Sequence, residues 1–346
     1  MEHRRRPGRR RFATGAEDQE VGPRPMRVLV TGAAGLYGVH VVDALVRRDD
    51  VEIVFGVDDL SRHFDLTDPF IPSTELATKF TLHQGDFRSL TPDRLDSWDL
   101  DVVIHLAAKT SIDESMDHPG LYFAHNEEGT FRFAQALLRT RKAPLLVYAS
   151  SPEVYGCPTY VPMDEDHPMH PRSTYAVTKL AAEKHCHSLY EWYGYPVIVI
   201  RNFNTYGENQ NTAGHAAVIP AFIRNALAHR PLEVSGDGRQ TRDFMYVADA
   251  VAAYVAVLEH KDRLIGATLN IGTGQETSIA DLAAIIIEMT GSPSKVVSIP
   301  SRPGDLPRLA AGTSRIHRGT GWRPRYPLRE GLERTIAWYR KVLYQS

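Results

Sequence analysis

The chain has 346 residues, of which 42% are hydrophobic and 24% are charged, and its formal net charge is −2. This length allows one large domain or two modest ones, each with a developed core. Because the charge is nearly balanced, the composition excludes a dedicated binder of nucleic acid or of an anionic membrane surface. No apolar run approaches the ~20 residues of a membrane helix. We therefore expect a small-molecule partner, with no nucleic acid and no membrane.

The two cysteines and the first 25 residues carry little structural signal. Cys157 and Cys186 are too few for a disulfide framework and lack a metal-ligand spacing, so we expect a reducing, cytoplasmic compartment and no metal site. Residues 1–25 begin with an arginine-rich run and lack the apolar stretch of a secretory signal. This composition predicts a disordered basic tail or an over-long start, in preference to a nucleic-acid arm.

From Met26 onward, short apolar runs alternate with helical patterns. Strands are predicted at 28–31, 52–58, 80–84, 102–106, 145–149 and 197–201, and helices at 37–48, 129–139 and 175–193. Alternation of this kind predicts βαβ units and a parallel sheet with helices on both faces. The predicted fold class is α/β, a Rossmann-like doubly wound sheet formed by residues 26–201.

After Arg201 the pattern becomes looser and more polar. Segments 202–242 and 276–346 are predicted to form a smaller substrate-binding lobe, and helices are predicted after Arg201 at 219–229 and 247–260. Residues 243–275 are expected to return to the first domain, because 268–271 has the pattern of a further strand. A lobe of this kind would stand against the carboxyl ends of the strands, where doubly wound sheets bind ligands.

A glycine-rich turn follows the first predicted strand. Gly32 permits a tight turn, Gly35 lets the backbone approach a diphosphate, and Gly38 allows close packing of helix on strand. The helix amides that begin at Leu36 and Tyr37 would face the phosphates. The alternative is a plain turn between a strand and a helix, and the flanking elements favour the nucleotide loop.

Two acidic positions extend this prediction to the rest of a dinucleotide. Asp58 ends the second strand, where a carboxylate accepts hydrogen bonds from the adenosine ribose and repels a 2′-phosphate. This favours NAD over NADP. Asp86 and Phe87 follow the third strand, where they would hold the adenine edge or form a solvated turn.

Tyr175 and Lys179 are four residues apart and therefore share one helix face. A free phenol has a pKa of ~10. A lysine cation and an oxidised nicotinamide beside it would lower that value, so that Tyr175 can act as the base for a substrate hydroxyl. By itself, a Tyr and a Lys at this spacing on a helix occur mostly by coincidence. Ser151 strengthens the prediction, because it adds a second hydroxyl at the end of the fifth strand.

Taken together, these motifs resemble the extended short-chain dehydrogenase/reductase family of NAD-dependent nucleotide-sugar epimerases, dehydratases and decarboxylases, from Met26 to the C-terminus. Further matches are His105-Leu106-Ala107-Ala108, Asn126 with Gly129-Thr130, Arg201-Asn202-Phe203-Asn204, residues 236–244 and Arg302-Pro303-Gly304-Asp305. The resemblance implies that the segment Leu106-Ala107-Ala108 contacts NAD.

The resemblance also implies substrate-binding residues, namely Lys109, Ser151, Asn204, Val218, Arg242 and Arg302. Planar, permanently charged arginines suit the diphosphate of a nucleotide sugar. The alternative for Arg242 is a structural ion pair. Residues 311–315 depart from the family by lacking the Asp and Lys often found there.

The shared first step of these enzymes is oxidation of the sugar at C4. Epimerisation then requires only the Ser/Tyr/Lys set, whereas dehydration and decarboxylation need further groups or a C6 carboxylate. Glu153 occupies the position where dehydratases and decarboxylases carry a Glu, but Pro152 replaces the neighbouring Asp acid of one dehydratase type. Glu153 is either an additional acid/base or a hydrogen-bonding strand-end residue. The pattern from Val218 onward favours C4 epimerisation, with the other two reactions as alternatives.

The alternative function of a different class is that of a catalytically silent NAD-binding regulator on the same fold. Such proteins typically lose the Tyr or the Lys, and this sequence keeps Ser151, Tyr175 and Lys179. We therefore expect an enzyme. The resemblance further implies a homodimer formed through the helix that carries Tyr175 and its neighbour at 126–139.

Overall fold

The computed structural model describes residues 24–61, 77–211, 217–301 and 304–344. Within these ranges, seven parallel strands form one sheet in the order β3-β2-β1-β4-β5-β6-β11. The strands are β1 (Met26–Thr31), β2 (Val51–Asp58), β3 (Phe80–Gln84), β4 (Val102–His105), β5 (Leu145–Ser150), β6 (Val197–Asn202) and β11 (Thr268–Ile271). The predicted Rossmann-like class is confirmed, since the chain winds outward from β1 in both directions. Residues 1–23 of the predicted tail, and Arg302, lie outside the described residues.

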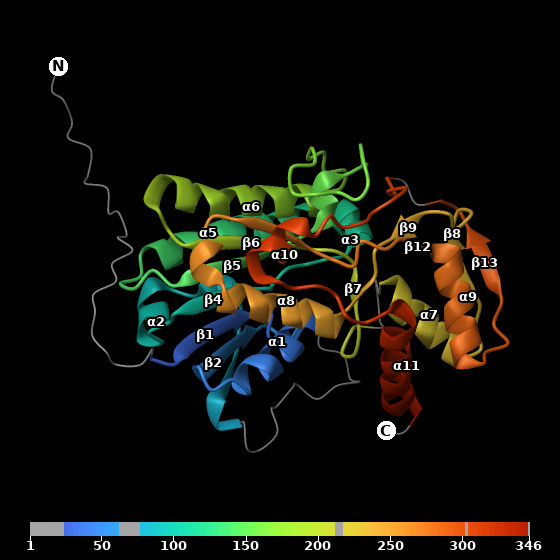
Figure 1. Ribbon diagram of the computed structural model, residues 1–346, viewed down its shortest axis with the longest axis horizontal. Coiled ribbons are helices and arrows are strands. Elements are labelled where there is room, and N and C mark those ends of the chain that lie inside the picture. Colours follow the sequence, from blue (N-terminus) through green and yellow to red (C-terminus); the bar gives the residue numbers. More distant parts are fainter. Residues whose placement is uncertain (1–23, 62–76, 212–216, 302–303, 345–346) are drawn as a thin grey trace.

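Helices cover both faces of this sheet (Figure 1). One face is covered by α1 (Leu36–Val46), α8 (Val247–Glu259) and α10 (Ser314–Thr320). The opposite face is covered by α2 (Pro92–Ser97), α5 (Glu128–Leu138) and α6 (Thr174–Tyr193). This arrangement explains the continuous apolar runs of the strands, because side chains on both faces of each strand are buried.

Neighbouring residues of β1 show how the two cores separate. Val28 and Val30 pack with α1 and α8, whereas Leu29 packs with α5 and α6, and all three are fully buried. This alternation follows from the period of two in a strand. Ile316 and Trp322, at and after α10, also pack in the core on the α1 and α8 face.

Short elements surround the carboxyl ends of the strands. They are α3 (Ile112–Asp117), α4 (Pro119–Tyr122), the π-helical segment η3 (Phe123–Glu127), and the 3₁₀ segments η1 (Ala77–Lys79), η2 (Phe87–Ser89), η4 (Pro152–Tyr155) and η5 (Lys261–Arg263). Thr91 caps α2, and Ser111 caps α3 by accepting a hydrogen bond from the amide of Glu114.

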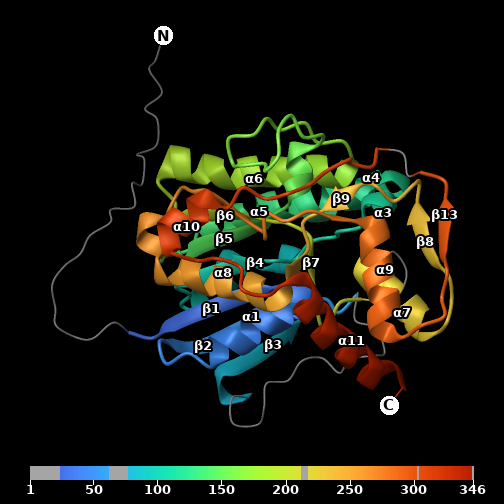
Figure 2. The same ribbon diagram turned by 45° about the vertical axis from the view of Figure 1, so that its right-hand side comes forward.

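A smaller lobe lies beside the sheet, to the right in both ribbon views (Figures 1 and 2). It contains α7 (Val218–Leu227), α9 (Ile279–Thr290), α11 (Leu328–Tyr344), β8 (Leu232–Ser235) and β13 (Val296–Ile299). Strands β8 and β13 pair in parallel, and the two-residue pairs β7 (Thr205–Tyr206) with β10 (Met245–Tyr246) and β9 (Thr241–Arg242) with β12 (Thr277–Ser278) connect the lobe to the sheet. The lobe has its own core, in which Phe222, Leu282 and Ile336 pack together.

Helix α9 illustrates how local sequence sets the ends of these elements. Ser278 caps its first turn by accepting a hydrogen bond from the amide of Asp281 (3.0 Å). Gly291 ends it in the left-handed conformation with φ 66°. In the part of the chain that the structure describes, none of the helices is long and apolar enough to cross a membrane.

Candidate active site

A cleft of about 800 Å³ lies between the carboxyl ends of the strands and the lobe. It brings together nearly all of the residues that the sequence singled out, from both the cofactor and the substrate sets. Its lining includes Gly32, Gly35, Leu36, Tyr37, Gly38, Asp58, Asp86, Phe87, Leu106, Ala107, Ala108, Lys109, Ser151, Glu153, Tyr175, Lys179, Asn204, Val218 and Arg242. We refer to this space as the main cleft.

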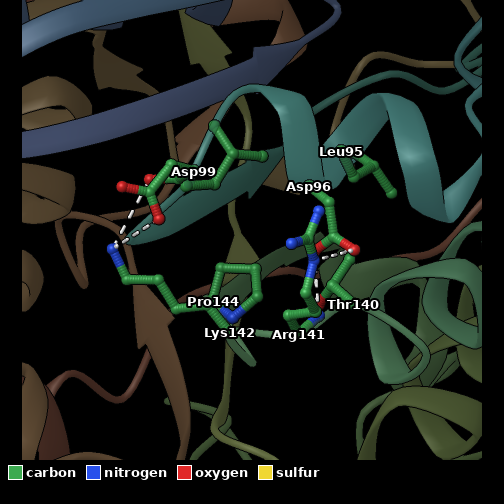
Figure 3. A pocket seen from close by; sticks show the side chains of 8 residues that line it. Leu95, Asp96, Asp99, Thr140, Arg141, Lys142 and Pro144 are labelled. Carbon is green, nitrogen blue, oxygen red and sulfur yellow. Dashed lines mark hydrogen bonds and ion pairs between the residues drawn. The ribbon is translucent and has the colours of Figure 1, made fainter.

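A second hollow, of about 260 Å³, lies at the opposite edge of the sheet (Figure 3). Its lining residues precede β4 and β5, so they sit at the amino ends of the strands. Two surface ion pairs, Arg141 with Asp96 and Lys142 with Asp99, lie along it. None of the predicted site residues lines it.

The glycine turn fits a dinucleotide because side chains are sterically excluded from it. A Cβ on Gly32, whose φ is +72°, would lie 2.8 Å from the amide nitrogen of Ala107. A Cβ on Gly38 would lie 2.0 Å from the carbonyl oxygen of Gly32. Helix α1 begins at this turn, and its N-terminus presents unsatisfied backbone amides to the cleft. The turn therefore forms a close-packed backbone cradle suited to a diphosphate.

The ends of β2 and β3 place the predicted carboxylates on the same side of the cleft. The Asp58 carboxylate accepts hydrogen bonds from the amides of Ala34 (3.0 Å) and Leu60 (2.8 Å). Asp86 caps η2 and pairs with Arg88. The Phe87 ring is buried and packs against His105. The roles of these residues toward the adenosine half of NAD remain predictions.

Asn126 fixes the segment that follows β4. Its side chain accepts a hydrogen bond from the amide of Lys109 (2.8 Å) and donates one to the Lys109 carbonyl (2.9 Å). Burial, followed by the charges of Arg88 and Lys109, lowers the pKa of His125. Lys109 lines the main cleft, and its predicted role toward the substrate remains a prediction.

Helix α6 carries the predicted catalytic pair into the cleft. Ser173 caps the helix by accepting a hydrogen bond from the amide of Ala176 (3.1 Å). Ser151, at the end of β5, is hydrogen-bonded to the Tyr175 phenol. One turn along the helix, the Lys179 ammonium donates a hydrogen bond to the carbonyl of Ala149 and lies 4.5 Å from the centre of the Tyr148 ring. The structure thus brings together the three residues that the sequence predicted as a catalytic set.

The protein alone perturbs both titratable groups of this set. Burial raises the pKa of Tyr175 to about 12, which the hydrogen bond with Ser151 opposes and the charge of Glu153 reinforces. Burial lowers the pKa of Lys179 to about 7, partly offset by Cys186 and Glu183. The sequence predicted that Lys179 lowers the pKa of Tyr175. In the protein alone the pKa of Tyr175 is raised instead, because desolvation outweighs the other effects.

Glu153 lies in η4, immediately beyond Ser151 and Pro152. Its backbone amide donates a hydrogen bond to the Ser151 hydroxyl (3.3 Å), and its carboxylate acts electrostatically on Tyr175. This places a carboxylate next to the predicted base. It leaves open whether Glu153 transfers a proton or stabilises the loop.

The lobe side of the cleft carries three of the predicted substrate residues. Val218 begins α7 and packs partly into the core of the lobe. The Oδ1 atom of Asn204 is buried and finds no hydrogen-bond partner among the described residues. Arg242 pairs with Asp305 and donates a hydrogen bond to the Leu306 carbonyl (2.8 Å). The ion pair that the sequence left as the alternative for Arg242 is therefore present, and phosphate binding by this side chain remains a prediction.

Several cleft residues were not identified from the sequence. Trp338 and Tyr339 reach the cleft from α11, and the Tyr339 hydroxyl donates a hydrogen bond to the Gln210 carbonyl. Their helix has no motif that separates cleft from core positions. Gln240 and Phe244 also line the cleft. They belong to the segment 236–244 that matched the family, so attention to every polar and aromatic residue of that segment would have found them.

Comparison with known proteins identifies the family. Residues 28–272 match the model of the NAD-dependent epimerase/dehydratase family. The chain belongs to this family. This result confirms the predicted family, the enzyme class and the dependence on NAD, and the family residues span the glycine turn, the Ser/Tyr/Lys set and β11.

The curated relatives of this family member carry out different reactions. The chain is 35% identical to a UDP-glucose 4-epimerase of Mycolicibacterium smegmatis, over 91% of this chain and 99% of that one. It is 34% identical to a human dTDP-D-glucose 4,6-dehydratase, over 91% and 90% of the two chains. It is also 34% identical to a UDP-N-acetyl-alpha-D-glucosaminuronate decarboxylase of Bacillus cytotoxicus, over 91% and 98%. Epimerases, dehydratases and decarboxylases are thus related to the chain to nearly the same degree.

A solved structure agrees with the architecture. The UDP-glucuronic acid 4-epimerase of Bacillus cereus, in complex with UDP-glucuronic acid and NAD, superposes with a TM-score of 0.82 at 30% identity, covering 92% of this chain and 100% of that one. The similarity extends through the lobe as well as the sheet, which confirms the overall fold.

Proposed function

We propose that the protein is an NAD-dependent C4-epimerase of a nucleotide-linked hexose. The observation that carries this proposal is the joint placement of Ser151, Tyr175 and Lys179 in the main cleft, which the glycine turn also lines. Epimerisation at C4 requires only this set, because the transient ketone is reduced again on its other face. Pro152, which precedes Glu153, has no side-chain proton to give to a departing C6 hydroxyl.

When bound, NAD supplies the hydride acceptor and donor of the reaction. The cradle of Gly32, Gly35 and Gly38, with the α1 amides at Leu36 and Tyr37, would hold its diphosphate. Asp58, Asp86 and Phe87 would hold its adenosine half, and Leu106, Ala107 and Ala108 would support it from the end of β4. Lys109, which follows this segment, would contact the substrate.

Around the sugar, Tyr175 would accept the O4 proton while Ser151 holds that oxygen by a hydrogen bond. The ammonium of Lys179 would stabilise the phenolate that acts as base. The positive charge of the oxidised cofactor adds to this stabilisation, which offsets the burial that keeps the phenol protonated in the protein alone. The set would then return the proton when the ketone is reduced.

On the lobe side, Asn204, Val218 and Arg242 would bind the nucleoside diphosphate, and the same role is proposed for Arg302, which lies outside the described residues. Asn204 offers a buried amide oxygen with unused hydrogen-bonding capacity in the described structure. Arg242 lies in the cleft with its guanidinium oriented by Asp305, which fits a planar donor that recognises phosphate. The nucleobase would lie farther along the lobe.

Dehydration or decarboxylation is the second candidate, because Glu153 places a carboxylate close enough to influence Tyr175. In that case Glu153 would act as the additional acid/base at C5 or C6. A silent regulator would have lost a member of the catalytic set, and all three are in place.

We further propose that the protein is a homodimer formed through α5 and α6. Two large apolar side chains are exposed on these helices, Phe131 on α5 and Val177 on α6. Three more are exposed on the short elements before them, namely Met116, Leu121 and Phe123. Exposed apolar side chains on neighbouring elements favour an association surface. Sedimentation of the full chain would distinguish a dimer from a monomer.

Product mass distinguishes the reactions. The purified protein would be incubated with UDP-, dTDP-, GDP- and CDP-hexoses, and the products followed by mass spectrometry and chromatography. Epimerisation gives a new species of unchanged mass, dehydration removes water, and decarboxylation removes carbon dioxide. We expect unchanged mass, and Glu153→Gln is expected to leave most of the activity. Loss of water or carbon dioxide that depends on Glu153 would replace the epimerase proposal with the second candidate.

A further inference from the structure

Helix α6 presents three polar side chains, each one turn from the next, toward the end of β5. Tyr175, Lys179 and Glu183 are spaced by four residues, and their exposed fractions are 8%, 4% and 0%. The first two belong to the proposed catalytic set. The third lies deepest and has no part in the proposed chemistry.

Each of these three side chains contacts a different residue of the stretch 149–151, which comprises the end of β5 and the residue after it. Tyr175 is hydrogen-bonded to Ser151, and Lys179 donates to the carbonyl of Ala149. Glu183 accepts a hydrogen bond from the hydroxyl of Ser150 (2.7 Å). The catalytic face of α6 is therefore attached to the end of β5 at three consecutive positions.

Glu183 is held from behind by Arg201 on β6. The Arg201 guanidinium donates to both carboxylate oxygens of Glu183, at 2.6 and 3.1 Å, and both residues are buried. It also donates to the Tyr155 hydroxyl (2.7 Å) and lies 4.7 Å from the centre of that ring. Tyr155 ends η4, the loop that carries Glu153, so one guanidinium joins β6, α6 and the loop beside the catalytic set.

The bidentate pair satisfies the charges of both partners. Burial by itself would raise the pKa of Glu183, but the hydrogen bonds and charge of Arg201 lower it below its ordinary value. Glu183 is therefore ionised at neutral pH. A buried charge pair of this quality is costly to desolvate and is often replaceable by apolar residues without loss of stability. Its presence here suggests a role beyond stability.

Other groups face Lys179 from the elements packed against it. Tyr148 on β5 and Cys186 on α6 are buried, and burial raises their pKa values, so both are neutral. His105 on β4 is also neutral, because burial lowers its pKa well below the ordinary value. Among the groups that act on Lys179 in the described structure, Glu183 is thus the ionised one.

We propose that Glu183, locked by Arg201, is a positioning residue that fixes the catalytic face of α6 on β5 and places a carboxylate charge one helix turn from the Lys179 ammonium. Only the predicted change in activity depends on the proposed function. The predicted change in the Lys179 titration does not. Removal of the Glu183 charge leaves the Lys179 ammonium buried without a nearby anion, so Lys179 releases its proton at lower pH. The alkaline limb of the rate profile follows, because a neutral Lys179 no longer stabilises the Tyr175 phenolate.

The test is Glu183→Gln in the full chain with its cofactor retained. The titration of Lys179 is followed by NMR of isotope-labelled lysine, with the Lys179 signal assigned from Lys179→Arg. We expect the titration midpoint, and the alkaline limb of kcat, to move down by about one pH unit, and kcat to fall about tenfold while KM changes little. An unchanged titration midpoint and an unchanged pH profile would overturn the proposal.

A matched control separates this effect from the loss of any buried carboxylate. Asp249→Asn removes the charge of a buried aspartate on α8 that accepts hydrogen bonds from the amides of Arg325 (2.8 Å) and Tyr326 (3.0 Å), away from α6. It should lower stability without moving either pH readout. A shift as large as that of Glu183→Gln would assign the effect to general destabilisation and contradict the proposal.

Two further variants keep the test decisive if Glu183→Gln does not fold. Glu183→Asp retains the charge and should restore a Lys179 titration close to that of the unmodified protein. Ser150→Ala removes only the contact of Glu183 with β5 and should lower kcat severalfold with the titration unchanged. Full activity in Ser150→Ala would contradict the positioning role.

The NMR titration needs no sugar turnover, so an inactive protein whose Lys179 still responds to Glu183 overturns only the proposed function.

Discussion

The two sides of the main cleft are built differently. On the sheet side, Ser151, Tyr175 and Lys179 are buried. The phenol of Tyr175 is hydrogen-bonded to Ser151, and the ammonium of Lys179 donates a hydrogen bond to the carbonyl of Ala149. On the lobe side, Asn204 and Arg242 are partly exposed and belong to elements of two to four residues or to loops. The outer strand of the lobe, β13, is exposed along its whole length.

This difference indicates how reaction and recognition are divided. The groups that carry out hydride chemistry need a fixed geometry, and a packed parallel sheet supplies it. The groups proposed to recognise the nucleotide and the sugar lie on short elements and loops, which tolerate change. The chemistry of the family is therefore strongly encoded in this chain, whereas the identity of the sugar is not.

Loss of the base should have the largest effect on the sheet side. Tyr175→Phe is expected to lower kcat about a thousandfold, because general-base catalysis of this kind contributes 10²–10⁴-fold. Cofactor binding should be retained. Tyr190→Phe, which alters a half-exposed phenol on the same helix, serves as the control and should leave the rate unchanged. A fully active Tyr175→Phe protein would break the assignment of chemistry to this side.

The glycine turn should be the next most sensitive feature. Gly38→Ala places a methyl group 2.0 Å from the Gly32 carbonyl oxygen, so the turn or the start of α1 has to move. We expect NAD affinity, measured by calorimetry, to fall about a hundredfold, equivalent to ~2.7 kcal/mol. Gly120→Ala meets no atom within 4 Å and is the matched control. Equal affinities in the two variants would show that the turn does not hold the cofactor.

Lys179 should make stability depend on pH. Its pKa is lowered from 10.5 to about 7 in the folded protein, so its contribution to stability is fully present above pH 10.5 and is lost as the pH falls through about 7. Lys179→Met should therefore be inactive yet more resistant to denaturant than the unmodified protein at neutral pH, with the advantage fading toward pH 10. Denaturant titrations at several pH values measure this. An advantage that does not change with pH would contradict the burial argument.

The smallest effect is expected on the lobe side. Arg242→Lys keeps the charge but loses the planar fork, so KM for the nucleotide sugar should rise about tenfold with NAD affinity unchanged. Arg239→Lys, at an exposed position of the same segment, should change neither. An unchanged KM in Arg242→Lys would leave this arginine as the structural partner of Asp305.

Much of the sheet side was predictable from sequence, because its signals are local. The seven strands, the glycine turn and the spacing of Tyr175 and Lys179 each occupy one short segment. Contacts between distant segments were not predictable. Arg201 matched a family motif, but nothing in the sequence pairs it with Glu183 or sets both behind the catalytic face.

The lobe shows the same limit of prediction from the sequence. Trp338 and Tyr339 enter the cleft only because α11 packs across the lobe, and their amphipathic helix has the same pattern as a helix that covers a core. Tertiary packing, which periodicity does not encode, decides these positions.

The most direct test of the central claim follows the hydrogen at C4. A nucleotide hexose carrying deuterium at C4 would be converted by the purified protein, and the label located by NMR and mass spectrometry. The account predicts a C4 epimer of unchanged mass that retains the deuterium at C4, with transient absorbance of reduced nicotinamide. A product that has lost water or carbon dioxide would contradict epimerisation. An epimer formed with loss of the C4 label to solvent would contradict hydride transfer itself.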